Sequence, residues 1–176
     1  MEPIANYTMY TPRIGTILWI MDQNNLILYH RLNFLSVTQL DFIPDGYNNS
    51  IAILLKHMAA LETFFCTYTI HCRPFSEEEL SFWHGSLPGQ MSLRIIHGSP
   101  FTYYFDLLSA ARTNTKNELL QKNDEWLEEI SLADIAAPGK MQKPNGYYWS
   151  HILHDHISHY GQIVQILNYF SGKTEK

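Results

Sequence analysis

Apolar side chains recur at helical spacing in four long stretches of the chain. These stretches cover about residues 13–33, 50–70, 102–129 and 146–171. The first one shows the pattern plainly, because a single stripe holds Ile14, Leu18, Met21, Leu28 and Leu32, with Asn25 on the same side. Spacings of three, four and seven residues are typical of one face of an α-helix. The pattern therefore predicts four long amphipathic helices.

The segments between these stretches carry helix caps and helix breakers. Ser36 can cap a short helical turn, and Asn49 or Ser50 can cap the second long helix, because their side chains accept hydrogen bonds from free amides. Residues 73–100 are rich in proline and glycine, with one predicted helical turn at SEEELSFW. A connection of this length in a compact domain often covers a site. We predict an all-α protein of one domain, residues 1–176: a four-helix bundle with a long crossover between helices 2 and 3.

The last stretch holds the densest group of reactive side chains. Its segment WSHILHDHISHYGQI contains four of the nine histidines. If the segment is helical, Asp155 and His159 lie one turn apart on the inner apolar face, and His151 extends that row by one turn. His154 and His156 fall on either side of the row, so we interpret them as surface or interface residues.

A carboxylate and an imidazole on a core-facing stripe need a partner, because burying either group alone costs several kcal/mol. One resolution is a metal ion, since both groups are common ligands and this spacing lets two side chains reach one point. The other is a buried Asp–His hydrogen bond. Both readings stay open on the spacing of Asp155 and His159 alone.

His57 bears on this choice. It stands in the otherwise apolar stripe of the second helix, which comprises Ile53, Leu54, Leu61, Phe64 and Tyr68. A lone histidine in such a row is more often a satisfied core residue than a ligand. If the second and last helices face each other, however, the presence of Asp155 and His159 favours a ligand role for His57 over that of a satisfied core residue.

Composition excludes several classes of function. The net charge is −5, so the chain lacks the basic footprint of a nucleic-acid-binding protein. No apolar run reaches the roughly 18 residues that a membrane span needs, and the first residues do not resemble a signal peptide. Cys66 and Cys72 are too few for a disulfide framework. We therefore expect a cytoplasmic protein without nucleic-acid or membrane partners.

The last helix has a second apolar stripe, on the side roughly opposite Asp155. Its members are Leu153, Ile157, Tyr160 and Val164. A helix that is apolar on two sides is buried on two sides. Another helix of the same bundle could cover this stripe, and so could a second subunit; we predict a homodimer.

Two segments resemble the DinB/YfiT-like superfamily of small metal-binding four-helix bundles. LSVTQLDFIPDGYNNSIAILLKHMAALE is similar to the family's segment that leads through a short turn and an Asn-Ser cap into a helix with a ligand histidine. HILHDHISHYGQIVQIL is similar to its last-helix motif, an H-x3-H pair followed by G-Q-I. The resemblance implies His57 as the first ligand and His159 as the last. The remaining ligand position falls on Asp155, where many members have histidine, and His151 is a candidate substitute.

The resemblance also implies a function. Characterised members include transferases and isomerases that use low-molecular-weight thiols, so the leading expectation is a metal-dependent thiol S-transferase holding a divalent ion such as Zn, Ni or Fe. A metal-dependent hydrolase is the next expectation. A stress-related bundle without activity, whose metal is structural or absent, is the competing one. The sequence leaves the catalytic side chain unknown, because Cys66 and Cys72 lack the local signature of an activated nucleophile and no G-x-S-x-G motif occurs.

Overall fold

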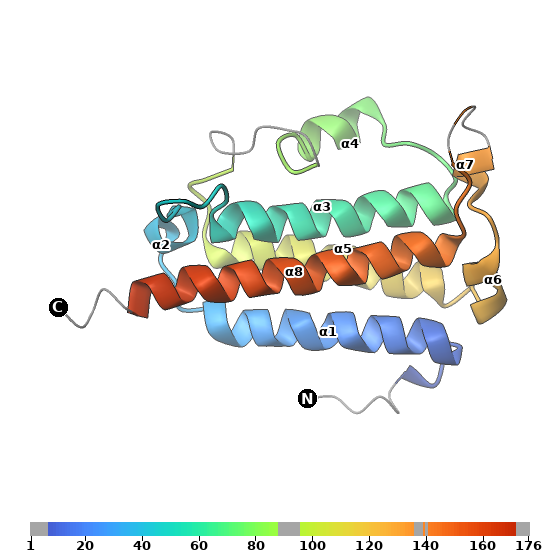
Figure 1. Cartoon of the computed structure of the whole chain (residues 1–176), viewed down its shortest axis with the longest axis horizontal. Helices are drawn as coiled ribbons and strands as arrows, with labels where there is room; N and C mark the ends of the chain where they lie inside the picture. Colours follow the sequence, from blue (N-terminus) through green and yellow to red (C-terminus); the bar gives the residue numbers. More distant parts are fainter. Residues whose placement is uncertain (1–6, 88–95, 136–138, 140, 172–176) are drawn as a thin grey trace.

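The computed structural model describes residues 7–87, 96–135, 139 and 141–171, and this part of the chain is helical without a β-strand. The all-α prediction is confirmed. Four long helices run side by side (Figure 1), namely α1 (Pro12–Leu32), α3 (Ile51–Ile70), α5 (Phe101–Leu119) and α8 (Asn145–Ser171). Four short helices lie in the connections: α2 (Val37–Asp41), α4 (Glu77–Phe82), α6 (Asp124–Glu128) and α7 (Leu132–Ile135).

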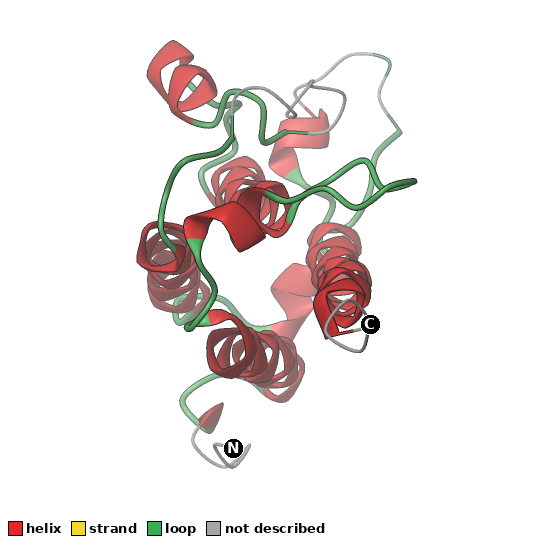
Figure 2. Cartoon of the chain, turned by 90° about the vertical axis from the view of Figure 1, so that its left-hand side faces the viewer, coloured by secondary structure: helices red, strands yellow, loops and turns green. Residues whose placement is uncertain are grey.

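The long helices surround a common core. α3 packs against α5 and α8, and α1 packs against the same two helices from the other side. The view along the helices shows this arrangement (Figure 2). The stripe predicted for the first helix is confirmed, since Ile14, Leu18, Met21, Leu28 and Leu32 are all fully buried.

α3 is the central helix of the core. By length and composition alone it could cross a membrane, and 72% of its most apolar window is buried inside the protein. The core helix of a soluble protein meets the same criterion, so this is weak evidence for a membrane span. The burial explains why α3 needs so few polar residues.

Three short polar motifs start helices as predicted. The Ser36 side chain accepts from the Gln39 amide at α2, and Ser50 accepts from the Ile53 amide at α3. Ser76 does the same for α4, which is the helical turn expected inside the crossover. These bonds satisfy amides that have no partner within their own helix. In Figure 1, α4 lies above α3, in the segment that connects α3 to α5.

The prediction of one helix over residues 102–129 is wrong. α5 ends at Leu119, and α6 starts after Asn123, whose side chain accepts from the Trp126 amide. The break places the Asp124 carboxylate at the start of α1, where it accepts from the Thr11 hydroxyl and the Arg13 amide. A carboxylate at a helix N-terminus is favoured by the helix dipole, so the interruption of one helix stabilises another.

A buried ionic cluster joins three of the long helices. The Arg112 guanidinium on α5 donates to both Glu62 oxygens on α3, at 2.8 and 2.9 Å. Its Nη1 donates to Asp22 on α1 at 2.6 Å, and the Lys116 ammonium donates to the same carboxylate at 2.8 Å. Glu62 is fully buried. Asp22 and Lys116 are partly exposed, so the ion pairs chiefly offset the cost of burying the charges of Glu62 and Arg112.

The second stripe of α8 is only partly covered within the chain. Leu153, Tyr160 and Val164 are half-buried, and Ile157 is 49% exposed. The other helices of the chain therefore do not bury this stripe completely.

Candidate metal centre

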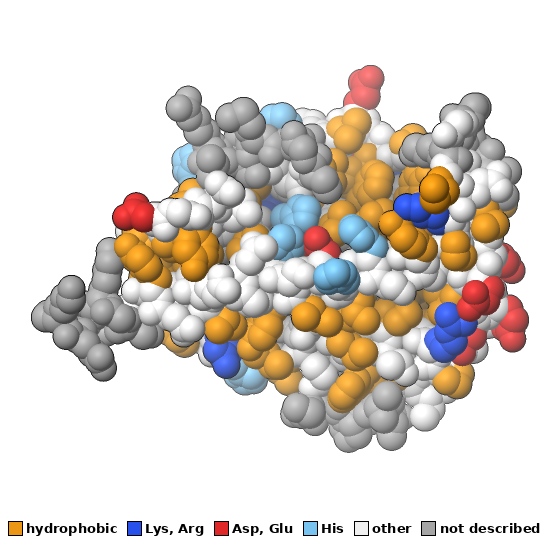
Figure 3. Space-filling view, in the orientation of Figure 1, with side chains coloured by type: hydrophobic (Ala, Val, Ile, Leu, Met, Phe, Trp, Pro, Cys, Tyr) orange, Lys and Arg blue, Asp and Glu red, His pale blue; other side chains and the backbone are white. Residues whose placement is uncertain are grey.

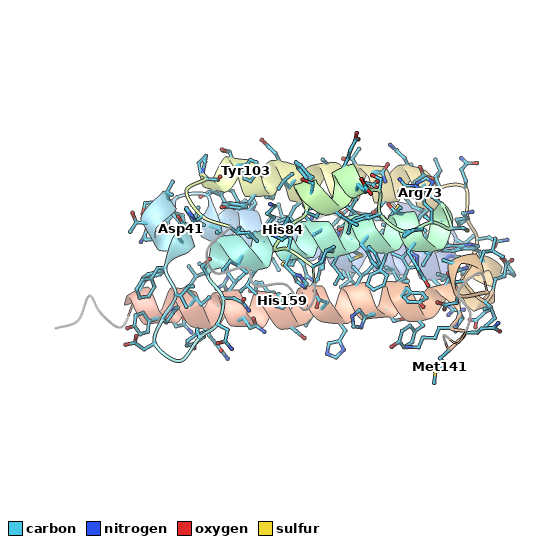
Figure 4. The ribbon with its side chains drawn as sticks, turned by 90° about the horizontal axis from the view of Figure 1, so that it is seen from above. Asp41, Arg73, His84, Tyr103, Met141 and His159 are labelled. Atoms are coloured by element: carbon cyan, nitrogen blue, oxygen red, sulfur yellow. The ribbon has the colours of Figure 1, made fainter. Side chains whose placement is uncertain are left out.

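Three of the predicted site residues meet where α3 packs against α8. His57 comes from α3, and Asp155 and His159 come from consecutive turns of α8. Figure 3 shows histidine side chains gathered around an acidic one on the face that these helices share, and Figure 4 labels His159 on α8. One ligand atom from each residue lies within 4.8 Å of the others. This group could hold a metal ion.

The distances within the group suit a shared cation. His57 Nε2 lies 3.5 Å from Asp155 Oδ2, and His159 Nε2 lies 3.3 Å from Asp155 Oδ1. Two ligand atoms bound to zinc at about 2.1 Å with a tetrahedral angle lie about 3.4 Å apart. A well-formed N–H···O hydrogen bond is shorter, at about 2.9 Å. Both Asp–His pairs are therefore spaced as two ligands of one zinc ion would be, and a long Asp–His hydrogen bond is the other arrangement that these distances allow.

Each histidine is held in one orientation by its other nitrogen. His57 Nδ1 donates to the Ser86 carbonyl at 2.7 Å, and His159 Nδ1 donates to Gln162 Oε1 at 3.3 Å. A carbonyl oxygen can only accept, so both Nδ1 atoms carry hydrogen, and Nε2 is the nitrogen that faces Asp155 in each ring. Outer hydrogen bonds of this kind orient the histidine ligands of metal sites.

In a neutral imidazole with hydrogen on Nδ1, Nε2 is an acceptor, like the carboxylate oxygens that it faces here. Asp155 Oδ2 is buried and has no hydrogen-bond partner. Acceptors that face one another repel unless a cation, either a metal ion or a proton, lies between them. The residues present therefore fit a metal ion, which would complete the bonding of an oxygen that is otherwise unpaired. The side chains are 15–19% exposed, so an ion or a small molecule can reach them.

The charges of the group respond to the same geometry. Burial alone would raise the pKa of Asp155, but its interactions with His159 and His57 hold that pKa well below its usual range. Burial alone would lower the pKa of His57, but Asp155 and the Ser86 carbonyl raise it above the usual value. Asp155 is consequently ionised at neutral pH, as a ligand must be.

The remaining histidines of α8 behave differently from one another. His154 is exposed, as predicted. His151 is also exposed and packs against the rings of Phe65 and Tyr147, outside the group that could hold an ion.

The surface prediction for His156 is wrong, because this residue is fully buried. Its Nε2 donates to the Met58 carbonyl of α3 at 3.4 Å, and its Nδ1 has no partner. α8 is covered by other helices on the side of His156 as well as on the side of Asp155. His156, which lies between the two apolar stripes of α8, is therefore inside the protein.

Two contributors to the site were not predicted. Ser86 belongs to the segment between α3 and α5 that was expected to cover a site, but no sequence pattern identifies which carbonyl of this segment faces His57. Gln162 had a detectable signal, since it follows His159 by three residues and therefore shares its side of the helix.

Fold and site together define an all-α protein with a two-histidine, one-carboxylate group that could bind a metal ion. Comparison with known proteins adds no further identification, because no family model matches the chain and no curated protein matches it. The resemblance to the DinB/YfiT-like superfamily therefore depends on the two quoted motifs.

Proposed function

We propose that the chain is a DinB/YfiT-like four-helix bundle that holds a divalent metal ion on His57, Asp155 and His159. In this proposal the segment between α3 and α5 is the long crossover between the second and third helices of the bundle. The observation that carries the proposal is the convergence of one histidine from α3 with two ligand-type residues from α8 around an unpaired carboxylate oxygen. Two nitrogen donors and one oxygen donor suit zinc, nickel or iron.

Each residue has a defined task in such a site. His57 and His159 keep their Nε2 lone pairs directed inward, because Ser86 and Gln162 hold the opposite nitrogens. Asp155 supplies the negative charge. A divalent ion bound there would act as a Lewis acid and lower the pKa of a thiol or water in the position that three protein ligands leave open.

We further propose that the reaction is a thiol S-transfer, in which the thiolate sulfur of a low-molecular-weight thiol forms a bond to an electrophilic co-substrate while the leaving group of that co-substrate departs with the electrons of the broken bond. Two lines of support are the motif resemblance and the absence of an activated protein nucleophile among the described residues. Burial raises the pKa of the Cys66 thiol to about 12, so this cysteine stays protonated at neutral pH. The nucleophilic sulfur would then come from the substrate.

Metal analysis of protein purified without added metal tests the first part. We expect about one divalent ion per chain, and a loss of that ion in His159→Ala but not in the exposed control His154→Ala. A large fall in melting temperature on metal removal would instead indicate a structural metal. Full metal content in His159→Ala would contradict the proposed ligand set.

Cobalt-substituted protein tests the thiol part. On titration with 2-mercaptoethanol, a sulfur-to-cobalt charge-transfer band should appear in the near ultraviolet, because the metal binds the thiolate form. A cobalt protein whose spectrum does not change with thiol would refute the transferase proposal while leaving the metal site intact.

A further inference from the structure

A pocket lies between α1 and α5, away from the candidate metal site that α3 and α8 form. Its volume is about 350 Å³, within the size range of small-molecule sites. α1 contributes Asp22, Asn25 and Leu26 to its lining, and α5 contributes Phe105, Arg112 and Lys116. Neither the proposed metal site nor its chemistry uses any of these residues.

The pocket is lined by buried polar side chains, although the contact between two packed helices is usually apolar. Asn25 and Arg112 are 8% and 5% exposed. Asn25 Oδ1 is buried and has no hydrogen-bond partner. Burying an amide oxygen without a hydrogen-bond donor costs free energy of folding. Because this oxygen lies on the wall of a pocket, it points to a ligand that donates a hydrogen bond to it.

The hydrogen-bonding capacity that remains unused is mainly that of cationic donors. Arg112 has five N–H groups, and its bonds to Glu62 and Asp22 use three. Lys116 uses one of its three N–H groups on Asp22. The Asp22 carboxylate accepts from Arg112, Lys116 and the Tyr7 hydroxyl, so its oxygens are already engaged.

The charge of the lining has the same sign as these donors. Two cations, Arg112 and Lys116, line the pocket with one carboxylate, Asp22. Burial alone would raise the pKa of Asp22, but both cations lower it below the usual value. The second carboxylate of the cluster, Glu62, is fully buried, bonds to Arg112 and does not line the pocket, so the cluster as a whole is neutral while the pocket is lined mainly by its cationic donors. Phe105 and Leu26 add apolar surface beside these donors.

We propose that this pocket binds a small organic carboxylate with an apolar body. The carboxylate accepts from the free N–H groups of Arg112 and Lys116, and the body lies against Phe105 and Leu26. Where the ligand also carries a hydroxyl or N–H group, Asn25 Oδ1 accepts from it; benzoate tests the carboxylate contacts alone. The proposal is independent of the metal, because the residues involved lie on α1 and α5.

Metal-free protein, treated with a chelator, is titrated with benzoate and separately with benzamide. The two probes have nearly the same size and shape and differ in charge. Binding is followed by NMR through the Arg112 Nε–H and the Asn25 side-chain amide signals. We expect benzoate to shift these signals with a dissociation constant in the millimolar range, and benzamide to bind about tenfold more weakly, because charge-assisted hydrogen bonds are the stronger ones.

Variants locate the site. Lys116→Gln should weaken benzoate binding about tenfold and leave benzamide unchanged, because it removes one cationic donor and keeps the length of the side chain similar. Lys122→Gln is the matched control: it removes the same charge from a lysine that packs on Trp126 and does not line the pocket. Equal binding of the two probes, equal effects of the two variants, or no shift of the Arg112 and Asn25 signals would each overturn the proposal.

Discussion

His156 should make this protein sensitive to mild acid. Its imidazole is fully buried and keeps one nitrogen unpaired. Burial lowers the pKa of His156 from 6.5 to about 4 in the folded protein. The unfolded chain, in contrast, takes up a proton on this residue at its ordinary pKa. Folding is therefore opposed by protonation of the unfolded state as the solution becomes acidic.

The size of the effect follows from the two pKa values. His156 contributes its full stability above pH 6.5, and that contribution is lost progressively as the pH falls toward 4. One pKa unit corresponds to about 1.4 kcal/mol. Between about pH 7 and pH 5 the free energy of unfolding should therefore fall by about 2 kcal/mol from this residue alone.

Urea denaturation of the wild type and of His156→Leu at both pH values measures the contribution of His156 to the free energy of unfolding. A chelator is present throughout, so that release of metal in acid does not contribute. The variant should lose about 2 kcal/mol less than the wild type over this range. His154→Leu, the same substitution at an exposed position two residues earlier, should keep the wild-type dependence. If His156→Leu and the wild type lose equal stability, His156 is not buried in its neutral form and the reasoning fails.

Three further predictions concern the site, the core and the surface. Asp155→Ala should weaken metal binding more than about 100-fold in calorimetry, since outer contacts alone are worth 10- to 100-fold, whereas Asp155→His should retain it; normal binding by Asp155→Ala would mean that Asp155 is not a ligand. Arg112→Met should cost about 3–5 kcal/mol in urea denaturation, because Glu62 stays buried without its cation. Adding Glu62→Leu should recover most of that loss, and an unchanged deficit would contradict the ion-pair explanation. Ile157→Glu should convert the proposed homodimer to a monomer in light scattering, and a wild-type protein that is already monomeric at high concentration would reject the dimer.

The long helices could be predicted because each one packs one face on the core. Its buried face therefore carries apolar residues at helical spacing, which is visible in the sequence. The break between α5 and α6 was missed because Leu119 and Leu127 keep helical spacing across it. Asn123 followed by Asp124 and Glu125 is a helix-start signal, but its role depends on the distant N-terminus of α1. Such a tertiary contact leaves no periodic trace in the sequence.

The site divides in the same way. The pairing of Asp155 with His159 is local, since one helical turn separates them, and it could be predicted from spacing. That His57 joins them required α3 and α8 to be neighbours, which the motif resemblance implied and the spacing alone did not. The partner of His57, the Ser86 carbonyl, is a backbone group, and its position depends on the path of the crossover rather than on the identity of the residue.

α3 carries two polar anchors that look in different directions. His57 faces α8, and Glu62, five residues later, reaches Arg112 on α5. At about 100° per residue the two side chains point about 140° apart around the helix axis. A rotation of α3 about its axis, or a shift by one residue along it, would break the contacts of both His57 and Glu62 at once. The rest of α3 is mostly apolar and could pack at several rotation angles, so these two contacts fix one rotation of the helix. The alignment of the candidate metal site therefore also depends on a salt bridge on the far side of α3.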